Sequence, residues 1–222
     1  ETSFRLILFF YINNFIKVLL VMILSHKYKF IFIKTRKTAG SSIEYNLSKC
    51  LGEKDVLTPL DNILNTEDAV SRNYIIHNRF SIVLRELGLI KLSKYFRDEF
   101  NTHEHCMKIK RMIGSRIWNS YFKFCVEREP VDKCLSYYFM RKNSPYSKPS
   151  RKKMSWDHFV KKGNFPVDDD FYVYKNNLMV DKIIKFENLN SEFSEVLNYL
   201  NIKNVNLNKK VNNTFRETLD FE

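Results

Sequence analysis

A short polar loop in the N-terminal quarter of the chain has the residue types that bind phosphate or sulfate groups. It follows residues 29–34 (KFIFIK), an apolar run typical of a buried strand, and it leads into residues 41–51, which have helical spacing. The loop and the first helical residues are Lys37, Thr38, Ala39, Gly40, Ser41 and Ser42. A strand–loop–helix junction offers free backbone N–H groups and the positive end of a helix dipole. The sequence therefore predicts an anion-binding loop at this position.

The side chains of this loop suit the same kind of ligand. Gly40 lets the backbone approach a phosphate closely, and Lys37 adds a positive charge. The hydroxyl groups of Ser41 and Ser42 can donate hydrogen bonds. The order of residues differs from the Walker A motif, G-x-x-x-x-G-K-S/T, because Lys37 precedes Gly40. The alternative interpretation is a polar turn that ends in an N-capping serine.

A second cluster follows the apolar run 121–127 (YFKFCVE), which is also typical of a strand. Arg128 comes directly after this run, at the carboxyl end of the predicted strand, where open α/β sheets bind their ligands. Pro130 suits the first turn of a helix, and Ser136 lies about two turns into that helix. We therefore predict that Arg128 faces a ligand crevice; the alternative for this residue is a surface ion pair.

The rest of the chain alternates between strand and helix patterns, which predicts an α/β fold with a mainly parallel sheet. Further strands are expected at 74–77 and 182–186. Helices are expected at 67–71, 80–100, 103–113, 131–141, 156–162 and 191–200, and an exposed loop at 143–153. The length of 222 residues fits one compact domain, and no internal repeat is evident.

Three segments together resemble the sulfotransferases that use 3′-phosphoadenosine 5′-phosphosulfate (PAPS). Residues 29–44 (KFIFIKTRKTAGSSIE) are similar to the family's 5′-phosphosulfate loop, with Arg36 where the family usually has proline. Residues 128–138 (REPVDKCLSYY) resemble its 3′-phosphate motif, R-N/D-P-x-D/E-R/K-x-V/L-S-x-Y/W, with Glu129 as a mild departure. Residues 180–189 (VDKIIKFENL) resemble a segment of carbohydrate-type members. The resemblance is closest to the glycosaminoglycan 2-O-sulfotransferases and their bacterial relatives.

This resemblance implies a fold, a reaction and a donor site. The fold would be a three-layer αβα sandwich with a central, mainly parallel sheet, like the P-loop nucleotide kinases. The reaction would move a sulfuryl group from PAPS to an acceptor hydroxyl, on an anionic or neutral glycan, and release 3′,5′-ADP without a metal ion. Lys37 would stabilise charge on the bridging oxygen. The donor would be bound by Arg36, Lys37, Thr38, Ala39, Gly40, Ser41 and Ser42 at its 5′ end and by Arg128 and Ser136 at its 3′-phosphate.

The resemblance also points to a histidine as the general base. His103 and His105 precede Arg128 by about two dozen residues, which is similar to the placement of the catalytic histidine in the 2-O-sulfotransferase group. We rank His103 first, His105 second and His77 third. A structural or merely exposed histidine is the alternative in each case.

The formal net charge of +12 predicts attraction to polyanions. A basic stretch that follows the second motif could guide an anionic acceptor, or could be a solvated run of charge. Its cations are Arg141, Lys142, Lys148, Arg151, Lys152 and Lys153. No nucleic-acid partner is expected from the sulfotransferase interpretation. Two other functions stay open: a nucleotide or small-molecule kinase on the same fold, and a non-catalytic basic protein that binds polyanions.

The two ends of the chain lie outside the predicted catalytic domain or at its limits. Residues 1–24 are expected to form an apolar extension or a membrane segment, although charged and amide residues interrupt the apolar run 4–24. Residues 25–222 are expected to form the sulfotransferase domain, with a further C-terminal piece absent from this sequence as an open alternative. We expect a cytoplasmic location, with membrane association through residues 4–24 as the alternative.

Overall fold

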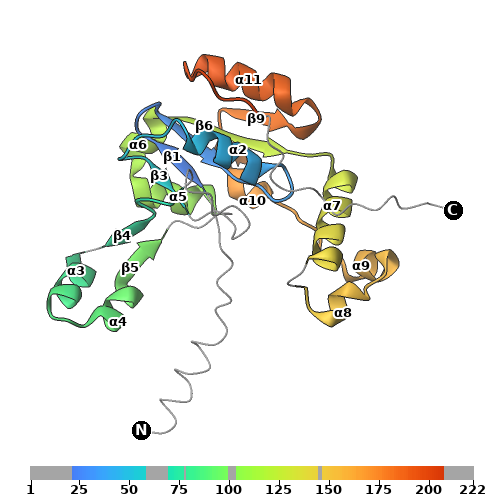
Figure 1. Ribbon diagram of the computed structural model, residues 1–222, viewed down its shortest axis with the longest axis horizontal. Coiled ribbons are helices and arrows are strands. Elements are labelled where there is room, and N and C mark those ends of the chain that lie inside the picture. The colour runs from blue at the N-terminus through green and yellow to red at the C-terminus, as the bar shows by residue number, and fades with distance from the viewer. Residues whose placement is uncertain (1–21, 59–69, 78, 100–103, 145–146, 208–222) are drawn as a thin grey trace, which may run out of the picture.

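A computed structural model describes residues 22–58, 70–77, 79–99, 104–144 and 147–207 (Figure 1). A five-stranded sheet in the order β3-β1-β2-β6-β9 forms its centre. The strands of this sheet are β1 (Ile23–Ser25), β2 (Phe30–Ile33), β3 (Val56–Leu57), β6 (Phe122–Glu127) and β9 (Lys182–Lys185). The sequence analysis predicted β2, β6 and β9, and all three are confirmed.

The sheet is mixed, with most of its strands pointing the same way. The pairs β2–β6 and β6–β9 are parallel, whereas β1 is antiparallel to both of its neighbours, β2 and β3. Every strand of this sheet except β1 therefore runs in one direction, and the expected mainly parallel sheet is confirmed in this form. The sequence analysis had no strand at β1, which begins within the apolar run 4–24. A tight turn joins β1 to β2, and Asp55 Oδ1 accepts hydrogen bonds from the backbone N–H groups of His26 and Lys27 in that turn.

Helices surround the sheet and extend from it. Those of the described residues are α2 (Gly40–Ser48), α3 (Arg79–Glu86), α4 (Ile90–Ser93), α5 (Cys106–Ile113), α6 (Ser115–Ser120), α7 (Pro130–Asn143), α8 (Pro149–Lys152), α9 (Trp156–Lys162), α10 (Asp169–Tyr172) and α11 (Leu189–Tyr199). The helices expected at 131–141, 156–162 and 191–200 are confirmed as α7, α9 and α11. The helix expected at 67–71 lies mostly outside the described residues.

Helices pack against both faces of the sheet. Successive side chains of a strand point to opposite faces, so Phe30 and Phe32 of β2 face α2 and α11, where they contact a buried cluster that includes Phe193. Ile31 and Ile33 face the other way and belong to a second buried cluster with residues of α5 and α6. Burial on both faces explains why β2 reads as an uninterrupted apolar run rather than an alternating one.

A small unit of α3, α4 and two strands lies beside the sheet, and it differs from the helix expected at 80–100. The helical pattern predicted at 80–100 forms α3 and α4, with the expected break at Gly88, but residues Arg97–Glu99 form strand β5 instead of helix. β5 pairs antiparallel with β4 (Ile75–His77), the strand expected at 74–77. Pairing with β4 satisfies the backbone of β5, and this tertiary contact overrides the local helical pattern.

A second small unit extends from the sheet on α7 (Figure 1). α7, α8 and α9 share an aromatic cluster that contains Tyr138, Phe139 and Phe159. The loop expected at 143–153 is partly wrong, because Pro149–Lys152 form α8; proline is well suited to the first turn of a helix. A short hairpin of β7 (Val173–Tyr174) and β8 (Asn177–Leu178) was also not expected.

The expected apolar extension or membrane segment at residues 1–24 lies largely outside the described residues. Among the residues that the structure does describe, no helix combines the length and the apolar character that a membrane crossing requires. Most of the apolar run 4–24 lies outside those residues.

Candidate functional site

The two predicted anion-binding segments lie side by side at one edge of the sheet. β2 and β6 are parallel neighbours, with Ile33 opposite Cys125, so their carboxyl ends meet at the same edge. Thr35 Oγ1, in the loop after β2, donates a hydrogen bond to the Val126 carbonyl near the end of β6. Arg128 Nη1 donates a hydrogen bond of 3.0 Å to the carbonyl oxygen of Lys37. The two segments therefore meet at this edge of the sheet.

The loop backbone adopts an uncommon conformation. Lys37 (φ 62°) and Ala39 (φ 61°) are both left-handed, which costs roughly 1–2 kcal/mol for a residue with a Cβ atom. Ala39 is the N-cap of α2, and its own side chain caps nothing; the serine cap considered as an alternative is not formed. A left-handed residue followed by a helical one turns successive N–H groups toward the same side, an arrangement that suits anions. The start of α2 thus has a backbone geometry that is compatible with a bound anion.

A buried lysine, which the sequence analysis did not single out, lies beneath the start of α2. Lys34 Nζ is 2.9 Å from Glu44 Oε2 and 3.0 Å from Ser41 Oγ. A Cβ atom added to Gly40 would lie 2.5 Å from Lys34 Cγ. The close approach that Gly40 permits in this structure is therefore that of the Lys34 side chain. A lysine at the end of an apolar strand was the only sequence signal for this contact.

We expect Gly40→Ala to destabilise the protein, because the Lys34 stem must move away from the new methyl group and lose its contact with Ser41. Overpacking of this kind costs roughly 1–3 kcal/mol, measurable as a fall in the midpoint of thermal unfolding. Gly52→Ala is the matched control, because a Cβ atom there would lie no closer than 3.7 Å to its neighbours. Equal stability of the two variants would contradict the close contact at Gly40.

Arg128 is enclosed by all three segments that carry the resemblance. Arg128 is only 9% exposed, and its Nε lies 2.5 Å from Oδ2 of Asp132, which lies in the first turn of α7. Its guanidinium carbon lies 4.1 Å from the ring centroid of Phe186, in the 3₁₀ helix η3 (Phe186–Asn188) that follows β9. Glu187 of the same turn accepts a 2.8 Å hydrogen bond from the Glu129 N–H. Arg128 does form an ion pair, as the alternative interpretation held, but a largely buried one.

Ser136 lies one turn beyond Asp132 on α7. It is 1% exposed, and its hydroxyl oxygen has no hydrogen-bond partner among the described residues. A buried polar group without a partner costs about 1–3 kcal/mol, so such groups call for an explanation. A ligand oxygen that reaches this hydroxyl would satisfy it.

Arg36 makes specific contacts with a distant segment. Its backbone N–H donates to Asp168 Oδ2 at 2.6 Å, its Nε to Asp168 Oδ1 at 2.5 Å, and its Nη2 to the Val167 carbonyl at 2.6 Å. In this structure these donors are directed at residues 167 and 168. Thr38 is buried and stabilises the loop internally, through a 2.9 Å hydrogen bond to the hydroxyl of Thr35.

The candidate histidines differ in what the structure shows of them. His103, ranked first, lies outside the described residues, and for His77 only the backbone position in β4 is described. His105 is exposed at the N-terminus of α5, and its Nδ1 lies 3.0 Å from the Asp170 carbonyl oxygen. The imidazole ring of His105 packs against the phenyl ring of Phe171. The guanidinium carbon of Arg36 lies 5.7 Å from the centroid of that phenyl ring. One aromatic ring therefore links His105 to the loop that follows β2.

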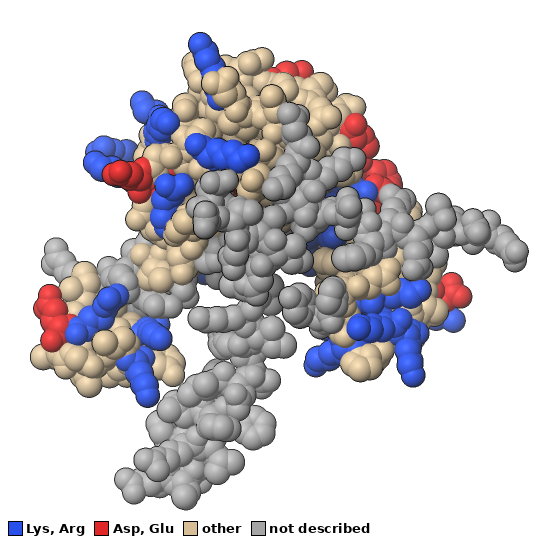
Figure 2. Space-filling view, viewed as in Figure 1, with Lys and Arg blue, Asp and Glu red and all other residues tan. Residues whose placement is uncertain are grey.

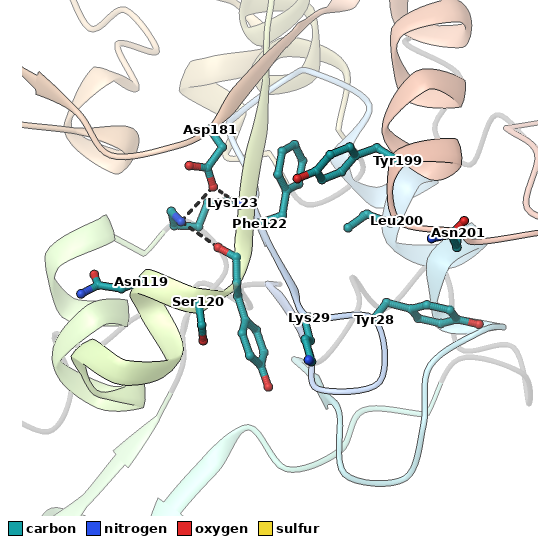
Figure 3. Close-up of a pocket in the computed structure, with 11 residues that line it drawn as sticks. Tyr28, Lys29, Asn119, Ser120, Phe122, Lys123, Asp181, Tyr199, Leu200 and Asn201 are labelled. Carbon is teal, nitrogen blue, oxygen red and sulfur yellow. Dashed lines mark hydrogen bonds and ion pairs between the residues drawn. The ribbon is translucent and has the colours of Figure 1, made fainter.

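A hollow of about 510 Å³ lies at the opposite edge of the sheet, around the amino ends of β2, β6 and β9 (Figure 3). In it, Lys123 Nζ lies 2.8 Å from Asp181 Oδ2, and the rings of Phe122 and Tyr199 are 4.7 Å apart. The charge of Lys123 is thus already matched by a carboxylate. The backbone and side-chain donors that suit an anion lie at the carboxyl edge, so we place the candidate site there.

The predicted basic stretch begins in the last turn of α7 and continues through α8. Four of its cations are exposed on or next to α8: Lys148, Arg151, Lys152 and Lys153. Figure 2 shows Lys and Arg side chains gathered over this part of the molecule. The guanidinium of Arg141 instead lies 5.4 Å from the ring of Tyr137. Within the described residues, no group of three or more His, Cys, Asp or Glu side chains could hold a metal ion.

Comparison of the chain with known protein families, with curated proteins and with solved structures found no match.

Proposed function

We propose that this chain is a PAPS-dependent sulfotransferase that sulfates a hydroxyl group of a carbohydrate. The observation that carries the proposal is the 3.0 Å hydrogen bond from Arg128 Nη1 to the Lys37 carbonyl. It joins the loop that resembles a 5′-phosphosulfate loop to the residue that resembles a 3′-phosphate ligand. PAPS carries a phosphosulfate group at its 5′ position and a phosphate group at its 3′ position. A site for this donor therefore needs both segments at one edge of the sheet. The nucleotide-kinase-like form of the fold is part of the same proposal.

Each group at this edge has a role in the proposed reaction. The N–H groups at the start of α2, with Ser41 and Ser42, bind the 5′-phosphate. Arg128 and the buried hydroxyl of Ser136 bind the 3′-phosphate. The acceptor oxygen attacks sulfur, the bond from sulfur to the bridging oxygen breaks, and 3′,5′-ADP leaves with the charge on that oxygen stabilised by Lys37. A histidine takes the proton of the acceptor hydroxyl.

Transfer of labelled sulfate tests this function directly. The protein is incubated with PAPS labelled in its sulfuryl group and with a panel of neutral and acidic glycans, and the products are separated and identified by mass spectrometry. We expect sulfated glycan and 3′,5′-ADP in equal amounts. ATP serves as the control donor, because phosphate transfer from ATP would favour the kinase alternative. Absence of both transfer from PAPS and binding of 3′,5′-ADP would contradict the proposal.

Polyanion binding without catalysis is the second candidate, supported by the exposed cations on and next to α8. Its affinity for polyanions should fall steeply with salt, with no preference for a 3′-phosphorylated nucleotide. A preference for 3′,5′-ADP over 5′-AMP that persists at 0.3 M salt, roughly double physiological ionic strength, separates the two functions.

Arg128→Ala should remove most of that preference. A hydrogen bond to a charged group is worth roughly 1.5–3 kcal/mol, so binding of 3′,5′-ADP should weaken by about ten- to a hundredfold. Binding of 5′-AMP, which lacks the 3′-phosphate, should change little. Titration calorimetry with both nucleotides measures the ratio, and this ratio corrects for any general loosening of the site.

Arg141→Ala is the matched control for this experiment. Like Arg128, Arg141 contacts an aromatic ring, but it lies in the last turn of α7, whereas Arg128 precedes the first turn of that helix. We expect its nucleotide affinities to match those of the unaltered protein. An equal loss of affinity for both nucleotides in Arg128→Ala would assign Arg128 a structural role only.

A further inference from the structure

A buried carboxylate lies behind the anion-binding loop. The side chain of Asp168, in the segment between α9 and α10, has no exposed surface. It accepts two hydrogen bonds from Arg36, one from the backbone N–H at 2.6 Å and one from Nε at 2.5 Å. Its Oδ2 also lies 2.9 Å from Lys133 Nζ, on α7. Asp168 therefore joins the loop to α7 although 132 residues separate it from Arg36 in the sequence.

The same network continues to the second anion-binding segment. Lys133 Nζ lies 2.5 Å from Glu127 Oε1, at the end of β6. The same oxygen of Glu127 accepts the backbone N–H of Arg128 at 2.9 Å. The hydroxyl of Tyr172 donates to the other oxygen, Glu127 Oε2, at 3.1 Å. The side chains of Asp168, Lys133 and Glu127 thus connect the backbone of Arg36 to the backbone of Arg128.

We propose that Asp168 is a positioning residue. It holds the loop at 36–42 in its ligand-binding conformation and keeps this loop in place next to Arg128. The identity of the ligand rests on the proposed sulfotransferase function, but the positioning does not. Arg36 directly precedes Lys37, the first of the two left-handed residues of the loop. A loop with such residues keeps its conformation only where surrounding contacts determine it. Asp168 supplies that contact on both the backbone and the side chain of Arg36.

The contact between Arg36 and Asp168 can be compared with a proline at position 36, the residue usual in the family that this loop resembles. A proline ring fixes φ and removes the N–H group, so it stiffens a loop from within. Arg36 has an N–H group and no such ring, and its N–H and guanidinium are instead held by a buried carboxylate. The stiffness of this loop is therefore set by a residue of another segment, and one substitution there should release it.

Hydrogen exchange of the ligand-free protein tests the positioning by itself. In Asp168→Asn, one of the charge-assisted acceptors is lost, so amides of residues 36–42 should exchange about ten- to a hundredfold faster. Amides of β6 should keep their rate. Asp169→Asn is the matched control, because it removes the same charge from the exposed neighbouring position. Equal rates at 36–42 in Asp168→Asn and Asp169→Asn, or an equal increase in β6, would overturn the inference.

Arg36→Ala provides a milder second variant that keeps the backbone N–H donor to Asp168. Its exchange rate at 36–42 should lie between those of the unaltered protein and Asp168→Asn. A rate no faster than that of the unaltered protein would show that the contact with the Arg36 side chain contributes nothing, which contradicts the two-point attachment. This variant remains informative where Asp168→Asn folds poorly.

Nucleotide binding then relates the positioning to function. Calorimetry with 3′,5′-ADP should show weaker binding to Asp168→Asn by about tenfold or more, with Asp169→Asn unchanged. If the unaltered protein binds no 3′,5′-ADP, the proposed function fails while the exchange rates still decide the role of Asp168. If Asp168→Asn binds 3′,5′-ADP as tightly as Asp169→Asn does, Asp168 does not position the site.

Discussion

Lys37→Ala should reduce sulfuryl transfer by about 10²–10³-fold, the usual effect of removing one group that stabilises charge in a transition state. In the proposed reaction, negative charge would grow on the bridging oxygen as 3′,5′-ADP departs, and the Lys37 ammonium is the proposed partner of that charge. The substitution leaves a Cβ atom on a left-handed residue, so it does not change the backbone strain of the loop. Binding of 3′,5′-ADP should therefore change much less than turnover.

Two variants complete this experiment. Lys37→Arg keeps the positive charge and should retain part of the activity. Lys29→Ala is a matched control, because Lys29 is also a left-handed lysine (φ 55°) but lies at the opposite edge of the sheet. Turnover of Lys37→Ala close to that of Lys29→Ala would remove Lys37 from the mechanism.

The charges at the site also bear on how salt should affect it. The cations Lys34, Arg36, Arg128 and Lys133 each contact a carboxylate of Glu44, Asp168, Asp132 or Glu127. Each of these four cations is therefore balanced by a carboxylate, so together they add little net positive charge to the site. Specific binding of a nucleotide at this edge should depend on salt less steeply than the attraction of polyanions to the exposed cations near α8, since buried pairs are screened less than exposed charges.

The sequence predicted the centre of the fold better than its margins. β2, β6 and β9 are compact runs of apolar and β-branched residues bounded by polar ones, so their pattern needs no tertiary information. β1 was missed because it continues a long apolar run that has no period of two. β5 was missed because its pairing with β4 decides its conformation, and β7 and β8 are too short to show a period.

The site was predictable where its residues are local to a motif. The loop after β2 and Arg128 after β6 could each be assigned to the carboxyl end of a strand, where open α/β sheets bind ligands, whereas the pairing of β2 with β6 that brings them together is known from the structure. Asp168 could not be connected to them, since a contact between residues far apart in the chain leaves no local pattern. The role of Lys34 was not predicted, because a lysine at the end of a strand is usually exposed, whereas Lys34 is buried beneath α2.

Either His103 or His105 should be the base, and the geometry of His105 gives it an advantage that the sequence did not show. A carbonyl oxygen can only accept, so the contact of Asp170 with Nδ1 places the proton of a neutral His105 on that nitrogen. Nε2 then carries the lone pair that a general base needs. The sequence order ranked His103 first; the described geometry leads us to expect the larger loss of activity from His105→Ala.

Substitution of the base should lower kcat by about 10²–10⁴-fold while donor affinity stays near normal, because a positioned base acts on the acceptor proton alone. In the proposed reaction, protonation of the base at low pH would stop transfer by the unaltered protein, so the acidic limb of the pH–rate profile should flatten in the variant that lacks the base. His158→Ala, at an exposed position on α9, is the control and should keep both activity and profile. If His103→Ala shows the larger loss and the flattened limb, the assignment moves to His103. A loss of only a few-fold in both variants would exclude the pair, and His77 would be substituted next.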